Sequence, residues 1–177
     1  MTPIREEFLL RLEAIHQQVD GLADSLAETL AERLVCRRGC SSCCIDDLTV
    51  FEVEAELIKS RCGDLLSGGQ PADRGGCAFL DDQGACRIYR WRPYVCRTQG
   101  LPLRWFDDEG QAVEMRDICP LNDEAITALG ENLSDLDSEK FWTIGPWEGK
   151  LATLQAEASG RFEPTRIPLR SLFLNSR

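Results

Sequence analysis

The stretch Cys36-Arg37-Arg38-Gly39-Cys40-Ser41-Ser42-Cys43-Cys44 places four thiols within nine residues. A buried structural cysteine usually stands alone in a core, whereas a loop rich in Gly and Ser can curl until several sulfurs meet one cation. The spacing of Cys40 and Cys43 lets one tight turn offer two thiolates to the same metal. This stretch therefore predicts a small domain organised by a metal centre.

Four more cysteines follow, each beside a predicted hairpin or turn. The eight candidate metal ligands are Cys36, Cys40, Cys43, Cys44, Cys77, Cys86, Cys96 and Cys119. Cys43 and Cys44 are adjacent, and because adjacent side chains usually diverge, we expect them to serve different metals, or only one of them to be a ligand. The ninth cysteine, Cys62, lies at a predicted helix end and is interpreted as a spare thiol.

The only histidine, His16, falls within a predicted N-terminal helix. We expect it to be a partly exposed helix residue and not a metal ligand. The candidate centre is then all-cysteine, which suits zinc or an iron–sulfur cluster and disfavours the histidine-dependent zinc hydrolases. With eight thiolates, two four-ligand sites are feasible, and a [4Fe–4S] cluster is one candidate cofactor.

The N-terminal sequence lacks the features of an export signal, because acidic residues stand where a basic segment belongs and no long apolar run follows. We therefore expect a cytoplasmic protein that does not enter a membrane. In that reducing compartment, nine cysteines indicate metal binding or catalysis more than disulfides.

The net charge of −10 argues against a nucleic-acid partner, which would require a basic face to displace counterions from phosphates. Residues 83–106 nevertheless contain no Asp or Glu, and their five arginines are Arg87, Arg90, Arg92, Arg97 and Arg104. Positive charge close to a thiolate cluster would lower the cost of gathering it. The candidates for this role are Arg37, Arg38, Arg87 and Arg97, unless they are surface residues that balance an acidic protein.

Apolar residues recur every seven positions near the N-terminus, in the two series Phe8, Ile15, Leu22 and Leu12, Val19, Leu26. This repeat predicts a long helix over residues 4–26 with one narrow apolar seam. The seam either packs on the helix's own domain or forms a coiled-coil dimer. Gly21 marks a possible bend or split.

The remaining patterns predict short elements. We expect a helix from Thr49 to Arg61 closed by a left-handed Gly63, then a loop over residues 63–76. Two hairpins are expected, one pairing 77–80 with 86–89 and one pairing 101–106 with 112–116. Helices are expected over residues 122–129 and 148–158.

These elements predict an α+β fold: a small, irregular, metal-stapled domain with short β-hairpins flanked by helices and a long N-terminal helix. We expect one compact domain of three parts, namely an N-terminal helical segment (1–35), a cysteine-cluster core (36–120) and a C-terminal helical extension (121–177).

The cysteine blocks resemble a known bacterial family, the CxxCxxCC or YkgJ-like cysteine-cluster proteins, described as zinc- or iron-chelating. The resemblance rests on the first cluster, on 77–80 and 86–89, and on Arg92-Pro93-Tyr94-Val95-Cys96-Arg97. It covers roughly residues 36–120, with Cys119-Pro120 at its end. The resemblance implies a metal or iron–sulfur centre.

Three classes of function follow from this interpretation. The first is a metal-binding protein with an all-cysteine iron–sulfur or zinc centre, with electron transfer as one use. The second is a zinc-stapled interaction module that binds a protein partner, or a second copy of itself, through the seam of residues 8–26. The third is a cluster-dependent oxidoreductase or protein-modifying enzyme, ranked last because no convincing acid–base pair lies near the arginine-rich stretch.

Overall fold

The computed structural model describes residues 4–37, 39–107, 113–161, 163 and 165–174. The chain forms two compact units. Unit 1 comprises Met1–Ile15, Arg38–Pro93 and Leu151–Arg177, and unit 2 comprises His16–Arg37 and Tyr94–Lys150. The α+β fold with a long N-terminal helix and short strands is confirmed, whereas the expected division into three segments stays a prediction.

The N-terminal helix α1 (Glu6–Thr29) contributes to both units and runs through Gly21 without a break. Its buried stripe includes Leu12, His16, Val19 and Ala23, spaced four, three and four residues apart as a 3.6-residue helical period requires. The expectation of a partly exposed His16 is wrong, because this position lies on the stripe and is 3% exposed. Leu22, one residue off the stripe, is exposed.

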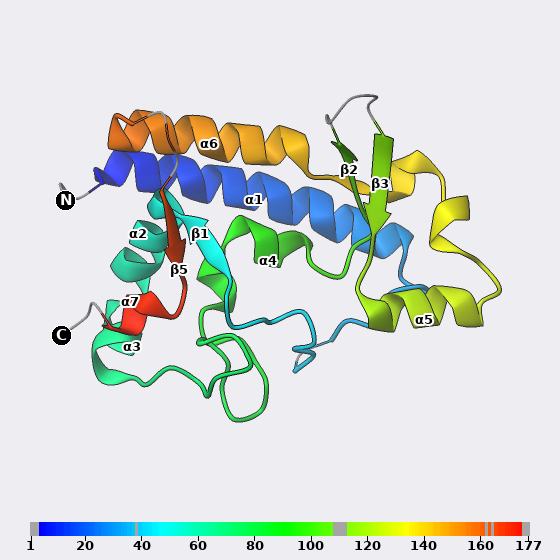
Figure 1. The fold of residues 1–177 in the computed structure, drawn as a ribbon, viewed down its shortest axis with the longest axis horizontal. Helices are drawn as coiled ribbons and strands as arrows, with labels where there is room; N and C mark the ends of the chain where they lie inside the picture. The colour runs from blue at the N-terminus through cyan, green and yellow to red at the C-terminus, as the bar shows by residue number, and fades with distance from the viewer. Residues whose placement is uncertain (1–3, 38, 108–112, 162, 164, 175–177) are drawn as a thin grey trace. The chain divides into compact units, whose positions relative to one another are not determined.

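Unit 1 is built on a two-stranded antiparallel sheet of β1 (Thr49–Phe51) and β5 (Arg166–Pro168). Helices α2 (Glu52–Arg61), α3 (Gly63–Gly68) and α7 (Ser171–Leu174) belong to the same unit (Figure 1). They enclose an apolar core that includes Val50, Ile58, Phe79 and Leu172.

Three local expectations in unit 1 are corrected. The helix expected from Thr49 begins at Glu52, because Thr49–Phe51 pairs with β5. Gly63 starts α3 and does not cap α2. The hairpin expected over residues 77–89 is reduced to one bridge between Leu80 and Cys86, followed by a single 3-10 turn, η1 (Tyr89–Trp91).

Unit 2 contains the second expected hairpin, formed by β2 (Leu103–Asp107) and β3 (Val113–Asp117). The rest of its expected turn, from Asp108 onward, lies outside the described residues. β4 (Trp142–Thr143) adds to β2 in parallel. The remaining elements are α4 (Tyr94–Thr98), α5 (Pro120–Ala128), the 3-10 turns η2 (Leu133–Asp135) and η3 (Ser138–Lys140), and the first residues of α6 (Gly145–Ser159).

The two later helices appear close to where the sequence predicts them. α5 begins at Pro120, two residues before the expected start, because proline is favoured in the first helical turn. α6 covers the expected 148–158, with Leu151 and Leu154 buried. Within the described part of the chain, no helix combines the length and apolarity needed to cross a membrane.

Candidate metal centre

All nine cysteines are thiols, and they fall into two groups. Unit 1 contains Cys40, Cys43, Cys44, Cys62, Cys77 and Cys86. Unit 2 contains Cys36, Cys96 and Cys119. The eight predicted ligands are thus divided into five in unit 1 and three in unit 2.

The cluster in unit 1 begins with a tight turn. The Cys44 amide donates to the Ser41 carbonyl at 2.9 Å, and the next amide, from Ile45, donates to the Cys43 carbonyl at 3.2 Å. The Cys44 thiol hydrogen-bonds to Cys43 and lowers the pKa of Cys43 to about 6, against the opposing effect of burial. The two adjacent side chains therefore do not diverge, and one of them is readily ionised near neutral pH.

A backbone hydrogen bond ties this turn to the next predicted ligand. The Cys77 amide donates to the Cys44 carbonyl at 2.9 Å. Cys86 lies in the isolated bridge to Leu80. Burial raises the pKa of Cys62, and the negative charge of an ionised Cys86 raises it further. Cys44, Cys62, Cys77 and Cys86 all pack on the core of unit 1.

Arginines lie close to two of these sulfurs. Burial raises the pKa of Cys77, and the Phe79 amide and the charges of Arg170 and Arg87 act in the opposite direction. Burial likewise raises the pKa of Cys86, opposed by the Ile88 amide and then by Arg92 and Arg87. The predicted role of Arg87 near thiolates is therefore compatible with its position.

Of the other three arginines proposed for that role, two are described by the structure. Arg97 is buried in unit 2, where its Nη1 donates to Asp20 Oδ2 at 2.5 Å. Arg37 is exposed, and Arg38 lies outside the described residues.

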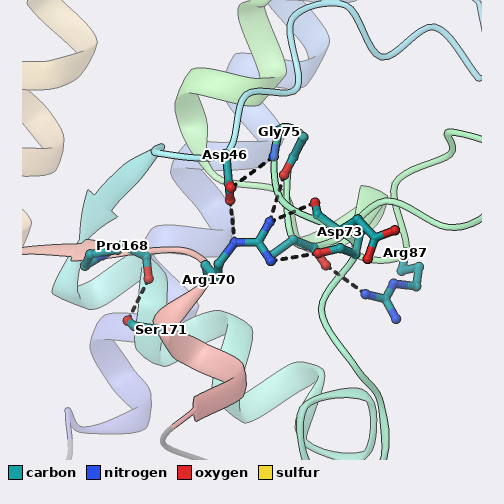
Figure 2. A network of polar contacts seen from close by, with 10 residues as sticks. Asp46, Asp73, Gly75, Arg87, Pro168, Arg170 and Ser171 are labelled. Carbon is teal, nitrogen blue, oxygen red and sulfur yellow. Dashed lines mark hydrogen bonds and ion pairs between the residues drawn. The ribbon is translucent and has the colours of Figure 1, made fainter.

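Arg170 is also the centre of a polar network on the cysteine loops (Figure 2). Its Nε donates to the carboxylate of Asp46, two residues after Cys44. Its two Nη atoms donate to carbonyl groups in the loop that leads to Cys77, at Ala72, Asp73 and Gly76. Arg87 reaches the same loop and donates to the Gln70 and Ala78 carbonyls, each at 2.8 Å.

In unit 2 an uncharged side chain, that of Asn122, makes the hydrogen bonds that connect a cysteine segment to its neighbours. Asn122 is fully buried, and its Oδ1 accepts the Val35 amide at 2.9 Å while its Nδ2 donates to the Gly100 carbonyl at 2.7 Å. These two bonds fix the orientation of the amide. The same Nδ2 lies 3.3 Å from the sulfur of Cys36, to which it donates its second hydrogen.

Gly100 completes the surroundings of the Cys36 sulfur. Its φ is +93°, and a Cβ built there would lie 2.7 Å from Cys36 Sγ. The Asn122 amide also donates to the Cys119 carbonyl at 2.9 Å. Asn122 therefore contacts the segment of Cys36 and Gly100 through its side chain, and Cys119 through its backbone N–H; Gly100 lies two residues after α4, the helix that contains Cys96.

The donor chemistry fits a thiophilic metal or a cluster. Thiols dominate both groups, one has a pKa near 6, and cationic and N–H groups lie beside others. Among the described residues, no three Cys, His, Asp or Glu side chains converge closely enough to hold a metal ion.

Sequence reasoning overlooked Asp46, Arg170 and Asn122. Asn122 carried a signal, as a possible N-cap of the helix after Pro120, but for a different role. Asp46 and Arg170 stand 124 positions apart in the sequence, and no local pattern marks such a pair.

The chain has no match among curated proteins and none among solved structures. Residues 35–120 match the sequence model of the CxxCxxCC family, described as "Putative zinc- or iron-chelating domain". The match includes all eight predicted ligands and supports metal binding, and it excludes Asn122 and Arg170. Residues 35–120 are thus identified as a CxxCxxCC domain.

Proposed function

We propose that this protein binds an iron–sulfur cluster or zinc through thiolates drawn from Cys36, Cys40, Cys43, Cys44, Cys77, Cys86, Cys96 and Cys119. One observation carries the proposal. The turn with the acidic Cys43 thiol is bonded through Cys44 to Cys77, and the charges of Arg87 and Arg170 act on the Cys77 sulfur.

The chemistry of thiolate clusters explains why these neighbours matter. Several thiolates on one ion form an anionic group, which burial alone would disfavour. Arg87 and Arg170 offset that charge, and the hydrogen bond between Cys43 and Cys44 means that one thiol is already ionised at neutral pH. A bound iron–sulfur cluster would supply one-electron redox chemistry, whereas zinc would cross-link the loops.

The two groups of ligands receive separate assignments. In unit 1 the candidates are Cys40, Cys43, Cys44, Cys77 and Cys86. In unit 2 the three candidates are Cys36, Cys96 and Cys119. Electron transfer is our proposed use of the centre if it is an iron–sulfur cluster.

Anaerobic purification followed by metal analysis, sulfide analysis and visible absorption tests the proposal. Iron and sulfide with broad visible absorption would identify a cluster. Colourless protein with stoichiometric zinc would retain the ligands and remove the redox function. Protein with neither metal, even after anaerobic reconstitution with each, would overturn the proposal.

A matched pair of variants tests the ligand assignment in unit 1. Cys77→Ala and Cys62→Ala each delete a thiol that packs on the same apolar core, so their losses of packing are comparable. Only Cys77 belongs to the proposed ligand set. We expect Cys77→Ala to lose bound metal and Cys62→Ala to retain it, and equal retention by both would remove Cys77 from the set.

The other two classes of function have less support. Three of the six seam residues, Phe8, Leu12 and Val19, are buried within the chain itself, while Leu22 is exposed. The proposed coiled-coil surface is thus reduced to part of the seam. In the arginine-rich stretch, Arg104 donates to Thr143 Oγ1 at 2.8 Å and Arg97 is paired with Asp20. Arg87 and Arg92 also donate to backbone carbonyls, so at least four of the five arginines make hydrogen bonds within the chain.

A further inference from the structure

The C-terminal segment that contains β5 and the residues after it lies outside the CxxCxxCC match but packs within unit 1. β5 pairs with β1 along Thr49–Phe51, and the Leu169 amide donates to the Leu48 carbonyl at 3.0 Å. Leu169 and Leu172 are almost completely buried in the core of the unit. Arg170 stands between these two anchors, so its backbone position is fixed.

The side chain of Arg170 uses this position to bridge two cysteine loops (Figure 2). Its Nη1 donates to the Ala72 carbonyl at 2.7 Å, and its Nη2 donates to the carbonyls of Asp73 at 3.2 Å and Gly76 at 3.0 Å. Its Nε donates to Asp46 Oδ1. One guanidinium therefore bonds the residue before Cys77 and a residue just after the Cys40–Cys44 turn.

Asp46 closes the bridge from the other side. Its second oxygen, Oδ2, accepts the Gly75 amide at 3.2 Å. The side chains of Asp46 and Arg170 are only 15% and 17% exposed, so water competes weakly for these contacts. A planar guanidinium can donate in several fixed directions at once, which an ammonium group cannot reproduce.

We propose that Arg170 is a positioning residue that holds the Cys40–Cys44 turn and the 70–77 loop in register, so that thiolates from both loops can bind one metal. This inference rests on the proposed function. It assigns part of the metal centre to a C-terminal segment outside the family match. Burial raises the pKa of Cys77, the positive charge of Arg170 lowers it, and the negative charge of Asp46 raises it, so the proposed role of Arg170 rests on its hydrogen bonds.

The chain supplies a matched control for this role. Arg161, also in the C-terminal stretch of unit 1, pairs with the nearly buried Glu52 at the start of α2. Removing Arg161 also breaks an arginine–carboxylate pair, but this arginine is more exposed than Arg170 and its partner lies on a helix and not on a cysteine loop. A general loss of stability would affect both variants, whereas a role in metal binding would affect only Arg170.

The test uses the full chain and Zn²⁺ alone as the probe, with affinity measured by competition against a chromophoric chelator under reducing conditions. We expect Arg170→Ala to weaken Zn²⁺ binding by about 10- to 100-fold, as is typical when a residue that orients metal ligands is lost. Arg170→Lys should weaken Zn²⁺ binding less than Arg170→Ala, because lysine keeps the positive charge but lacks the planar set of N–H donors. Arg161→Ala should remain within about twofold of the wild type.

Hydrogen exchange in the metal-free protein provides a second readout. The Ala72, Gly75 and Cys77 amides all donate hydrogen bonds in this region. Arg170→Ala should accelerate exchange across residues 70–78, and Arg161→Ala should not. If Arg170→Ala does not fold, Asp46→Asn and Arg170→Lys provide the same comparison, with smaller losses of affinity expected.

The outcomes separate this inference from the function on which it rests. Wild-type affinity in Arg170→Ala, or equal losses in Arg170→Ala and Arg161→Ala, would overturn the inference and leave metal binding intact. Wild-type protein that binds neither Zn²⁺ nor reconstituted iron would overturn the proposed function and this inference with it.

Discussion

The cysteine segments of the two units are held by different kinds of interaction, an ion pair in unit 1 and hydrogen bonds of a neutral amide in unit 2. In unit 1 an ion pair, Arg170 with Asp46, joins the loops that lead to and from the cysteines. In unit 2 the neutral side-chain amide of Asn122 bonds the Cys36 sulfur, the Val35 amide and the Gly100 carbonyl. Arg170 and Asn122 each make several hydrogen bonds, and neither of these two residues lies within the family match.

Burial accounts for this difference. The Asn122 side chain is fully enclosed, and a charged pair there would lose its hydration with little return. Arg170 and Asp46 retain some contact with water, so the desolvation cost of their charges is smaller. The charges of both residues act on Cys77. The contacts of Asp46 therefore depend on a carboxylate that titrates, whereas those of the Asn122 side chain involve a neutral amide that does not.

The largest effect concerns ionisation within unit 1. The hydrogen bond from Cys44 lowers the pKa of Cys43 from 9.0 to about 6, whereas burial raises that of Cys77. In metal-free protein, alkylation of Cys43 by iodoacetamide should therefore rise with a midpoint near pH 6, and that of Cys77 only above pH 9. Peptide mass spectrometry after timed labelling measures both.

The same shift has a defined sign for stability. Because the folded pKa of Cys43 lies below its unfolded value, its contribution is complete only above the unfolded pKa and is lost as the pH falls through about 6. Cys44→Ala removes the donor and should move the Cys43 midpoint upward. A Cys43 midpoint above pH 8 in the wild type would contradict the prediction.

The next effect tests the amide of unit 2. Asn122→Leu leaves the Val35 amide and the Gly100 carbonyl without their side-chain partner, and should reduce the free energy of unfolding by about 2–3 kcal/mol. Asn132→Leu, which alters an exposed amide bonded to Asp135, should change it by about 0.5 kcal/mol or less. Urea denaturation followed by tryptophan fluorescence measures both, and similar values would refute a special role for Asn122.

A smaller effect concerns the space around the Cys36 sulfur. Gly100 and Gly130 both have positive φ, so alanine at either should cost about 1 kcal/mol in backbone strain. Only at Gly100 would the new Cβ meet Cys36 Sγ, at 2.7 Å, whereas Gly130 has nothing within 4 Å. Gly100→Ala should therefore lose about 1 kcal/mol more than Gly130→Ala in the same denaturation assay.

A double variant checks the cause of that excess. Cys36→Ala combined with Gly100→Ala removes the sulfur that the new methyl group would meet, and should recover most of the additional loss. If the excess persists in the double variant, the contact with Cys36 is not its origin.

The smallest effect is the difference in pH dependence between the Arg170–Asp46 ion pair and the hydrogen bonds of Asn122. The hydrogen bond from Arg170 holds the pKa of Asp46 below its usual range. The stability that Asp46 contributes is thus present above the ordinary aspartate pKa of about 4 and is lost only as the pH falls further. Asn122 has no titrating group, so its contacts should not change over this range.

Hydrogen exchange after incubation between pH 7 and pH 3 compares the two units. The Gly75 amide, bonded to Asp46, should lose protection below about pH 4, and the Val35 amide, bonded to Asn122, should keep it. Loss of Gly75 protection already at pH 5–6 would show that Arg170 does not stabilise the Asp46 carboxylate.

Much of the fold could be predicted from local patterns. The hairpin of β2 and β3 and the helices α1 and α6 follow from alternation and periodicity. α2 ends at Arg61 as expected, although Gly63 starts α3 and does not cap α2. The errors share one cause, since tertiary partners overrode local preference. Thr49 joined a strand because β5 lies beside it, and His16 became buried because it shares a helical stripe with Leu12 and Val19.

For the candidate site, the sequence predicted that the donors are thiols. Closely spaced thiols in a loop with Gly and Ser favour metal binding, because such a loop can bring several sulfurs to one cation. The family match over residues 35–120 agrees with that interpretation.

By itself, then, the sequence determined the spacing of the thiols, the CxxCxxCC blocks and the α+β pattern, because spacing along the chain is a local property. Only the tertiary structure decided how the cysteines divide between two units, that Cys43 and Cys44 share a hydrogen bond, and that Arg170 meets Asp46. The physical reason is that a guanidinium, an amide and a carboxylate acquire their roles from the groups that folding places beside them.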